Sequence, residues 1–554
     1  MDRGPITRGF RVGLYAALPL ALLVLLYADR RQWFFYDDWE FLATRGLGGQ
    51  PLDLFRPHNA HWSTIPLLVY RALYTVVGIR SYVPYLLVLL VLHLATAYVL
   101  WRVMLRLGAD GWIATGLAIV FLLVGAGYQN LTWGFQIGYI APLLLGFAAA
   151  MLTDRPGAGF SRRDLWVWLL AVAGLMCSAI GITMVVLLVL VALLRRGWRA
   201  AFITASVPTA VYLIWLLAIG RHYLLADSTV NAQTLLLIPD FVWAGLTATV
   251  DRVTGLVGIG AVAILGLLAW LVLKRRDATA LPLAFAGAIT ALAFFMFDGI
   301  DRTANGSAAA ATSRYLYVGA ALLLPITAVI MSSLVRRELL HQVVLVALAA
   351  FATVHGVSYL FDQTRALGLV KQQEEQQILA GAALLRAGAP VIGAHPDDRW
   401  APDLTTRDLG IMVREGRVAT GVSIAPVNQL DAELLLQVAA APAPLVTEDS
   451  PVTVTVNGTA AAPGPEGCVT TATDSVTTAT LQFAQFGWVS VRSPASGTLV
   501  ARLSGGGAIS DPAILATLSP NVSVDVSDVA RLAQLVLTLA PGTTLCGNLA
   551  AATP

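Results

Sequence analysis

The chain has 554 residues, of which 57% are hydrophobic and only 12% are charged, and its mean hydropathy is +0.72. Soluble globular domains carry about 25% charged residues, so this composition excludes a soluble protein and predicts an integral membrane protein. The formal net charge of +3 is too small to indicate a nucleic-acid partner, and we expect none.

Apolar runs of about 17 to 25 residues, the length that crosses a bilayer, recur through the first 360 residues. They lie at roughly 12–28, 82–101, 112–127, 137–152, 200–219, 256–273, 279–297, 315–333 and 341–360. The stretch 165–194 is too long for one span, and its small, polar middle at 177–183 favours a turn. We interpret it as two short helices. The sequence therefore predicts a polytopic α-helical membrane protein with about eleven transmembrane helices and an uncleaved first helix.

Basic residues fall in every second loop between these spans. They are Arg102 with Arg106, Arg155 with Arg162 and Arg163, Arg195 with Arg196 and Arg199, Lys274 with Arg275 and Arg276, and Arg336 with Arg337. Because short loops rich in Lys and Arg stay in the cytoplasm, we expect a multi-pass plasma-membrane protein with its N-terminus inside. Residues after about 361 would then lie outside, as would the loops at 29–81, 129–136, 221–255 and 297–314.

The polar C-terminal part has a different character. Residues 363–386 have helical composition and are predicted to form a solvated helix leaving the membrane. After Pro451 the alternating segment 452–456 and the turn pair at 457–458 predict an antiparallel β-sandwich of about 100 residues. We expect a transmembrane catalytic domain at 1–361, a helical and mixed connector at 362–448, and an extracytoplasmic β-sandwich at 449–554.

The three cysteines separate by region. Cys468 and Cys546 are the only two in the polar C-terminal part and lie near the two ends of the predicted β-sandwich. A domain that faces an oxidising compartment can form such a bridge, so we predict a disulfide between them. Cys177 lies in an apolar run, where we expect a packed small hydrophobe.

Ionisable residues gather just after the first span, where a membrane protein rarely places them without a function. Asp37 and Asp38 are adjacent, so their side chains cannot point the same way on a helix or a strand. That arrangement lets one carboxylate take a proton from a hydroxyl while the other holds a cation or orients the acceptor. Glu40 adds a third carboxylate as a candidate substrate contact. The alternative is a helix cap at an aromatic, acidic membrane edge.

The same loop carries His58, Asn59, His61 and Trp62. Their spacing predicts that the two imidazoles share a helix face, with the amide and the indole offering contacts to a sugar or a phosphate. Two imidazoles with a carboxylate, Asp38 being the candidate metal ligand, also suit a divalent cation such as Mg²⁺, Mn²⁺ or Ca²⁺. The alternative is a set of interfacial residues at the start of a helix at 63–74.

Three further groups lie at predicted outer ends of spans. Trp133 and Gln136 are spaced to share a helical face at the tip between the third and fourth spans, where Gln129 and Asn130 add amides suited to sugars. Arg314, followed by Tyr315, is unexpected on the outer side, because basic residues favour cytoplasmic loops. Its guanidinium group fits the oxygens of a phosphate. Arg221 and His222 are a weaker form of the same pattern. The alternatives are ordinary polar tips and side chains that reach lipid headgroups.

Together these residues resemble a known superfamily. An Asp-Asp pair after the first span, His-Asn-x-His-Trp later in that loop, the tip Asn-Leu-Thr-Trp-Gly-Phe-Gln-Ile-Gly and a Ser-Arg-Tyr-Leu-Tyr element resemble the GT-C polytopic glycosyltransferases. The chain looks most like actinobacterial members, arabinofuranosyl- or mannosyltransferase-like, with the outer β-domain plan of mycobacterial arabinosyltransferases. The resemblance covers about residues 10 to 360 through short motifs.

The resemblance implies a transferase of class EC 2.4 that moves a sugar from a polyprenyl-phosphate donor to a cell-envelope glycan or lipid acceptor among the membrane lipids. It further implies an inverting-type single displacement with Asp37 or Asp38 as base and Arg314 on the lipid phosphate. We expect the β-domain to be a carbohydrate-binding or positioning module. The alternative is a transporter or flippase of a lipid-linked sugar, although transporters place ionisable residues at the membrane midplane. A third interpretation is a non-catalytic scaffold that binds the cell wall.

Overall fold

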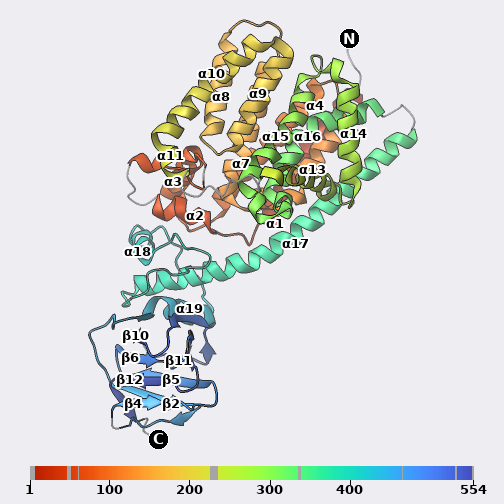
Figure 1. Cartoon of the computed structure of the whole chain (residues 1–554). Helices are drawn as coiled ribbons and strands as arrows, with labels where there is room; N and C mark the ends of the chain where they lie inside the picture. Colours follow the sequence, from red (N-terminus) through yellow and green to blue (C-terminus); the bar gives the residue numbers. More distant parts are fainter. Residues whose placement is uncertain are drawn as a thin grey trace. The chain divides into compact units, whose positions relative to one another are not determined.

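The computed structural model describes residues 6–45, 51–59, 61–224, 235–334, 339–464, 466–530 and 533–551. The chain forms two compact units (Figure 1). The first unit comprises Met1–Gln32, Gly48–Leu73 and Tyr82–Leu369. The second comprises Trp33–Leu47, Tyr74–Ser81 and Val370–Pro554. The segment that carries Asp37 and Asp38 therefore belongs to the same unit as the C-terminal part of the chain.

The first unit is helical. Its described elements are α1 (Ile6–Ala28), η2 (Pro51–Leu54), α3 (Thr64–Val77), α4 (Val83–Arg106), α5 (Gly111–Leu122), η3 (Gly125–Gly127), α6 (Tyr128–Thr132), η4 (Gly134–Gln136), α7 (Ile137–Thr153), α8 (Arg162–Leu175), α9 (Ile180–Arg196), α10 (Trp198–Trp215), η5 (Leu216–Gly220), α11 (Arg221–Leu224), α13 (Ile238–Thr254), α14 (Ile259–Leu273), η6 (Arg275–Asp277), α15 (Pro282–Arg302), η7 (Thr303–Asn305), η8 (Ser307–Ala311), α16 (Ser313–Leu334) and α17 (Leu339–Arg386). Helix α7 packs against α4, α8 and α9, and α16 packs against α4, α5 and α15. Helices α3 and α17 each continue into the second unit.

Each predicted span coincides with a helix. The predicted number of about eleven spans is not confirmed, because within the described residues 8 helices are long and apolar enough to cross a membrane, or up to 9 if the bent pair α13–α14 is one span. The predicted split of 165–194 is confirmed, because α8 and α9 are separate, but they have only 14 and 17 residues. The chain is a polytopic helical membrane protein with a C-terminal β-sandwich.

The predicted outer loop at 221–255 is wrong over its second half. Helix α13 occupies Ile238–Thr254 and packs against α15 and α16. It meets α14 at a bend of 117°, where Asp251 accepts hydrogen bonds from the backbone N–H groups of Gly258 and Gly260. Charged residues at Asp240, Asp251 and Arg252 lower the hydropathy of α13, so its sequence does not have the pattern of a span.

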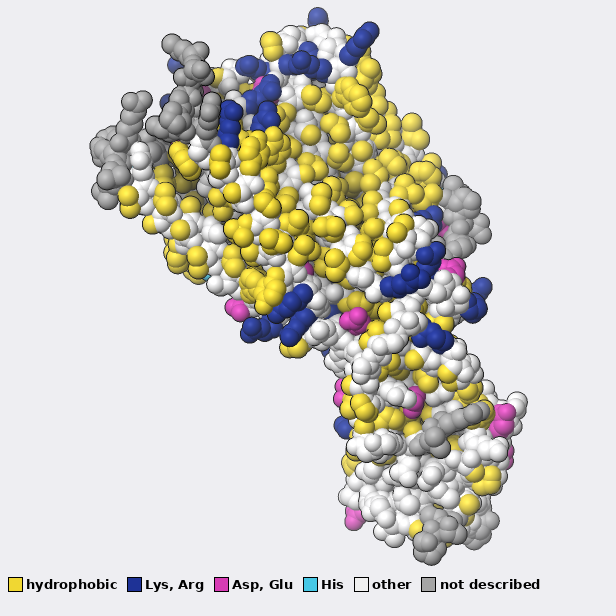
Figure 2. All heavy atoms as spheres, turned by 180° about the vertical axis from the view of Figure 1, so that it is seen from behind, with side chains coloured by type: hydrophobic (Ala, Val, Ile, Leu, Met, Phe, Trp, Pro, Cys, Tyr) yellow, Lys and Arg dark blue, Asp and Glu magenta, His cyan; other side chains and the backbone are white. Residues whose placement is uncertain are grey.

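The surface of the first unit is strongly apolar. Large hydrophobic side chains are more than half exposed on several helices, among them Trp166, Trp198, Phe202, Ile214, Val262 and Val272. Figure 2 shows this continuous hydrophobic surface, with Lys and Arg side chains mostly at its margins. Exposed apolar area costs roughly 25 cal/mol per Å² in water, so a lipid environment is the physical explanation for this surface.

The second unit brings together three distant stretches. Its described helices are α2 (Asp37–Trp39), η1 (Glu40–Thr44), α18 (Thr406–Arg414) and α19 (Pro426–Gln437), with the end of α17. The end of α3 joins the turn after α18, because Tyr74 Oη donates to Glu415 Oε2 (3.0 Å) and the Ile79 N–H donates to Arg417 O (2.8 Å). Gly78 has φ +66°, and a Cβ there would lie 2.4 Å from Arg417 O. This turn therefore requires glycine.

The predicted β-sandwich is confirmed. Its strands are β1 (Val438–Ala441), β2 (Val452–Val456), β3 (Thr459–Ala460), β4 (Cys468–Thr470), β5 (Thr477–Phe483), β6 (Gly487–Arg492), β7 (Gly497–Gly505), β8 (Ala508–Ile509), β9 (Ala513–Leu518), β10 (Ser523–Asp528), β11 (Gln534–Leu539), β12 (Thr544–Cys546) and β13 (Leu549–Ala551). One sheet has the order β1-β10-β6-β12-β4, and the other has β13-β2-β5-β11-β7-β8 with β3 and β9 at its sides. Alternate residues of both sheets, including Val489, Val526, Val454 and Leu481, form one core.

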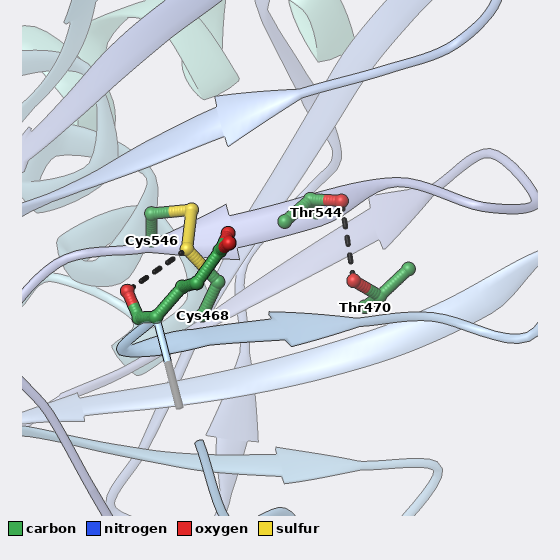
Figure 3. Close-up of a disulfide and its surroundings, with 5 residues drawn as sticks. Cys468, Thr470, Thr544 and Cys546 are labelled. Carbon is green, nitrogen blue, oxygen red and sulfur yellow. Dashed lines mark hydrogen bonds between the residues drawn. A yellow bond between two sulfur atoms is a disulfide. The ribbon is translucent and has the colours of Figure 1, made fainter. Parts of the chain in front are cut away.

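The predicted disulfide is also confirmed. Cys468 and Cys546 are direct cross-strand partners on β4 and β12 and are joined by an S–S bond (Figure 3). Two residues along the same strands, Thr470 Oγ1 and Thr544 Oγ1 are 3.3 Å apart. Cys177 is free and buried, as expected.

One expectation about α17 needs correction. The helix at 363–386 is present as the end of α17, but it is not solvated all round. Its buried positions include Thr364, Gly368, Lys371, Glu374 and Ile378, which follow one helical face at steps of three and four residues. Lys371 and Glu374 are each only 1% exposed. The Gln-, Glu- and Lys-rich end of α17 therefore has one buried face.

Candidate functional site

The Asp37-Asp38 pair lies on the three-residue helix α2. The residue before it, Tyr36, has φ 51°, a left-handed conformation that is uncommon for a bulky residue. Asp37 is half-buried, whereas Asp38 is fully buried and its Oδ2 accepts the backbone N–H of Phe35 at 2.9 Å. The two carboxylates therefore have different environments, as their adjacency predicts.

Other parts of the second unit surround this loop. The Tyr36 N–H donates to Trp400 O (3.0 Å), and the ring of Phe35 lies 5.4 Å from that of Trp400. Indole Nε1 of Trp39 donates to Glu374 Oε1 at 2.9 Å, and Lys371 Nζ lies 5.2 Å from the centroid of the Phe35 ring. The loop is thus held by the end of α17 and by the segment around Trp400.

Two further charged groups complete this neighbourhood. Glu40 pairs with the fully buried Arg45 (Oε1 to Nη1, 3.6 Å) across η1. Glu40 therefore has a structural role as the partner of Arg45, in addition to the predicted contact with a substrate. Asp397 caps the turn before Trp400 by accepting the N–H groups of Arg399 and Trp400. Burial raises the pKa of Asp397, although those two hydrogen bonds act in the opposite direction.

In the first unit, the expectation that His58 and His61 share a helix face is wrong. Their backbones form a bridge, with each N–H donating to the carbonyl of the other (2.9 and 2.8 Å), which closes a tight turn. Asn59 allows the turn because it adopts φ 43°, a conformation in which asparagine is enriched. Its Nδ2 donates to His58 Nε2 at 2.9 Å. Helix α3 begins only at Thr64, after the motif has ended.

Trp62 is placed by packing. Its ring stacks on Trp215 at 5.0 Å with an interplanar angle of 2°, and its Nε1 donates to Thr64 Oγ1. Only 5% of the residue is exposed. Trp62 is therefore packed inside the protein, and its role in sugar stacking stays a prediction. His58, by contrast, lies edge-on to Phe135 (5.0 Å), which brings the His58 turn against the tip between α6 and α7.

That tip does not have the predicted helical face. Trp133 is extended (φ −126°, ψ 111°) and only precedes the 3₁₀ turn η4 that ends at Gln136. Gln136 is fully buried, and neither atom of its carboxamide has a hydrogen-bond partner among the described residues. The same holds for Asn130 on α6, and for the hydroxyl of Thr132. Buried amides without hydrogen-bond partners lower the stability of the fold. This tip is therefore a polar site inside an apolar unit.

Arg314 lies in a cluster of aromatic and acidic side chains. Its guanidinium lies 5.4 Å from the centroid of the Tyr315 ring, and Tyr139 and Asp298 are its other titratable neighbours. Its Nε has no hydrogen-bond partner within the described part of the chain. The preceding residue, Ser313, accepts the Gln129 N–H with its Oγ (3.2 Å), which joins α16 to the amide tip. Asp298 is in the last turns of α15, so the predicted loop begins later than expected.

Arg221 and His222 are exposed on α11 and, among the described residues, form no hydrogen bond or ion pair with the Arg314 cluster. In the part of the chain that the structure describes, no group of three or more His, Cys, Asp and Glu side chains could hold a metal ion. A divalent cation at Asp38 or at the His58 turn therefore stays a prediction from the residue types alone.

Sequence reasoning missed Trp39 as an anchor, and it missed Lys371, Glu374, Tyr139 and Trp400 altogether. For Lys371 and Glu374 a signal existed, because their spacing of three continues the face set by Thr364 and Gly368. Their charge disguised it, since charged residues are almost never fully buried. For Tyr139 and Trp400 only the tertiary contacts reveal the association.

No protein-family model and no curated protein matches the chain. Among solved structures, the chain is similar to the crystal structure of ArnT from Cupriavidus metallidurans in the apo state, with 13% identity and a TM-score of 0.46. The match covers 75% of this chain and 89% of that one.

Proposed function

We propose that the protein is a GT-C-type glycosyltransferase that transfers a sugar from a polyprenyl-phosphate donor to a cell-envelope glycan or lipid acceptor. The single observation that carries the proposal is the unequal Asp pair, in which Asp37 is half-buried and Asp38 is fully buried on a helix anchored at both ends. The proposal places the reaction and the β-sandwich on the outer face of the plasma membrane, as the alternation of basic loops predicts.

The chemistry requires a base and a cation. An acceptor hydroxyl is a poor nucleophile until a base takes its proton. In a single displacement, the hydroxyl oxygen forms a bond to the anomeric carbon as the bond from that carbon to the phosphate oxygen breaks. The polyprenyl phosphate leaves with the electron pair, and the base keeps the proton. We assign the base to Asp37, because its side chain is partly exposed, and the positioning of the loop to Asp38, which binds the Phe35 N–H.

Positive charge is needed where the phosphate charge grows. Arg314 supports this role because it keeps a donor nitrogen without a protein acceptor in the described chain, inside a cluster with Tyr139 and Tyr315. The unpaired amides of Asn130 and Gln136, joined to α16 through the Gln129–Ser313 bond, support a nearby role in sugar contacts. The β-sandwich is proposed as an accessory module for glycan positioning.

The transporter alternative predicts ionisable groups that exchange protons or ions inside the spans. His93 on α4 is a test case because it is completely buried. Its Nδ1 hydrogen-bonds Tyr317 Oη (2.8 Å) and its Nε2 donates to Leu122 O (3.0 Å). Both ring nitrogens thus have protein partners, which suits helix packing and favours the transferase.

The deciding experiment is turnover with purified protein in detergent and a panel of farnesyl-phosphoryl sugars. We expect one sugar to be consumed, and Asp37→Asn to lower turnover by at least about 10²-fold, the smaller value of general-base assistance. Folding and farnesyl phosphate binding should be unchanged. Asp53→Asn, a change in the same long segment at a carboxylate 3.9 Å from Arg56, is the matched control. If Asp37→Asn and Asp38→Asn both keep near wild-type rates, this loop is not catalytic.

A further inference from the structure

Helix α2 cannot hold its own conformation. It has three residues, and isolated helices shorter than about 12 residues are marginal in water. It also follows a residue with positive φ. The orientation of Asp37 must therefore come from contacts that α2 and its flanks make within the second unit.

One of these contacts is unusual in its chemistry. The indole of Trp39, the last residue of α2, donates its only hydrogen bond to Glu374 Oε1 at 2.9 Å. Trp39 is 0% exposed and Glu374 is 1% exposed. The second oxygen, Oε2, has no hydrogen-bond partner among the described residues. Asp397, Lys371 and Asp38 are its charged neighbours.

A carboxyl group at this position does not benefit packing. A buried, half-satisfied acid is destabilising compared with an apolar side chain of similar size. Positions that break such a rule are expected mainly at functional sites. What the carboxyl supplies here is an acceptor for the Trp39 indole, and Trp39 is covalently continuous with Asp38 and Asp37.

We propose that Glu374 is a positioning residue that fixes the orientation of α2 through Trp39, and thereby aims Asp37 at the acceptor hydroxyl. The inference rests on the proposed function, in which Asp37 is the base. Glu374 touches no substrate in this scheme. Its effect is on the rate of the chemical step, because a misplacement of about 1 Å at a reacting group can cost about 10²-fold.

The test compares two substitutions that differ in one property. Glu374→Gln keeps an oxygen that accepts the indole N–H, whereas Glu374→Leu removes it. With the farnesyl-phosphoryl sugar that the wild type consumes, we expect Glu374→Gln to keep kcat within about threefold. Glu374→Leu should lower kcat by about 10- to 100-fold with KM within about threefold. The binding of farnesyl phosphate should be unchanged in both.

Two further variants make the result decisive. Glu375→Leu places the same apolar side chain on the neighbouring residue, which has no hydrogen bond to α2 among the described residues, and should keep kcat. Trp39→Phe removes the indole donor and should reproduce the loss in kcat; it replaces Glu374→Leu if that variant does not fold. A Glu374→Leu or Trp39→Phe enzyme with wild-type kcat overturns the inference, as does an equal loss in Glu374→Gln and Glu374→Leu.

The two hypotheses fail in different ways. If the wild type consumes no farnesyl-phosphoryl sugar, or if Asp37→Asn and Asp38→Asn both retain near wild-type rates, the proposed function itself fails. If Asp37→Asn is inactive and Glu374→Leu is not impaired, only the positioning role of Glu374 is wrong.

Discussion

Indole Nε1 of Trp39 lies 2.9 Å from Glu374 Oε1, although 335 residues separate them in the chain. The bond ties the short helix α2 to the end of α17, and both residues are buried. Two regions that look unrelated in the sequence, an aromatic acidic segment and a Gln- and Glu-rich helix, thereby form one structural element of the second unit. If Asp37 is the base, as we propose, its orientation then depends on this bond to α17.

Coupling between these two residues can be measured directly. In a double-mutant cycle of Trp39→Phe and Glu374→Leu, the loss in ln kcat for the double variant should be close to that of either single variant, because both remove the same hydrogen bond. Kinetics of the four proteins at saturating donor give the interaction energy. Strictly additive losses would show that the two side chains act independently.

Arg314 should bind the donor phosphate through its guanidinium fork. A hydrogen bond to a charged group contributes about 1.5–3 kcal/mol, so Arg314→Ala should weaken farnesyl phosphate binding by roughly 10- to 100-fold. Arg314→Lys should recover only part of it, because a point charge does not reproduce the fork. The measurement is a titration of detergent-purified protein. Arg221→Ala, at an exposed arginine on α11, serves as the comparison, and an equal loss there would move the phosphate site.

The Cys468–Cys546 bond joins two residues that are 78 positions apart in the chain. Such a bond restricts the unfolded chain and typically contributes about 2–4 kcal/mol. The double variant Cys468→Ser/Cys546→Ser should therefore lower the unfolding temperature of the β-sandwich, while Cys177→Ser should not. Peptide mass spectrometry of the non-reduced wild type should show the linked peptides. Two free thiols in protein isolated from the membrane would contradict an oxidising compartment.

Asp528 should make the β-sandwich less stable at high pH. Burial is the main cause that raises its pKa to about 7, and Glu433 adds to the effect. Its Oδ1 accepts the Ala530 N–H, whereas Oδ2 has no partner among the described residues. The pKa of Asp528 in the folded state is above its unfolded value near 3.8. The protonated carboxyl therefore makes its full contribution to the free energy of unfolding below about pH 4. This contribution is lost as the pH rises to about 7.

The expected loss is a few kcal/mol, since each pKa unit corresponds to about 1.4 kcal/mol. Thermal unfolding at pH 4.5, 6 and 8 should show this trend in the wild type, and Asp528→Asn should flatten it. Asp525→Asn, a half-exposed position on the same strand, is the control and should keep the wild-type slope. A slope unchanged by Asp528→Asn would mean that this carboxyl is ionised in the folded protein.

Membrane topology can be tested by labelling single introduced cysteines in intact cells with an impermeant maleimide. Ala158 lies in a loop predicted to be cytoplasmic and Ser475 lies in the β-sandwich, and both are exposed. Ser475→Cys should react and Ala158→Cys should react only after lysis, while the native cysteines stay silent because they are bridged or buried. The reverse pattern would invert the topology.

The features that depend on local periodicity and composition could be predicted from the amino-acid sequence. Apolar length predicts the spans, because a bilayer excludes unsatisfied backbone groups. Alternation with the Asn457-Gly458 turn predicts the β2–β3 hairpin, where both residues have positive φ. The disulfide follows from there being only two cysteines in one compact domain. The Asp pair stands out because acidic groups are rare at a membrane surface of this composition.

The burial of polar side chains and their contacts depend on how distant segments pack, so the sequence did not predict them. The helix face predicted for His58 and His61 failed because a single left-handed Asn59 closes a turn before α3 begins. Helix α13 escaped recognition because its charges reduce its hydropathy, although it packs against α15 and α16. The charges of Glu374 and Lys371 predict that both side chains are exposed to solvent. Their burial follows from long-range packing, which composition and local spacing do not encode because it depends on segments more than 300 residues apart.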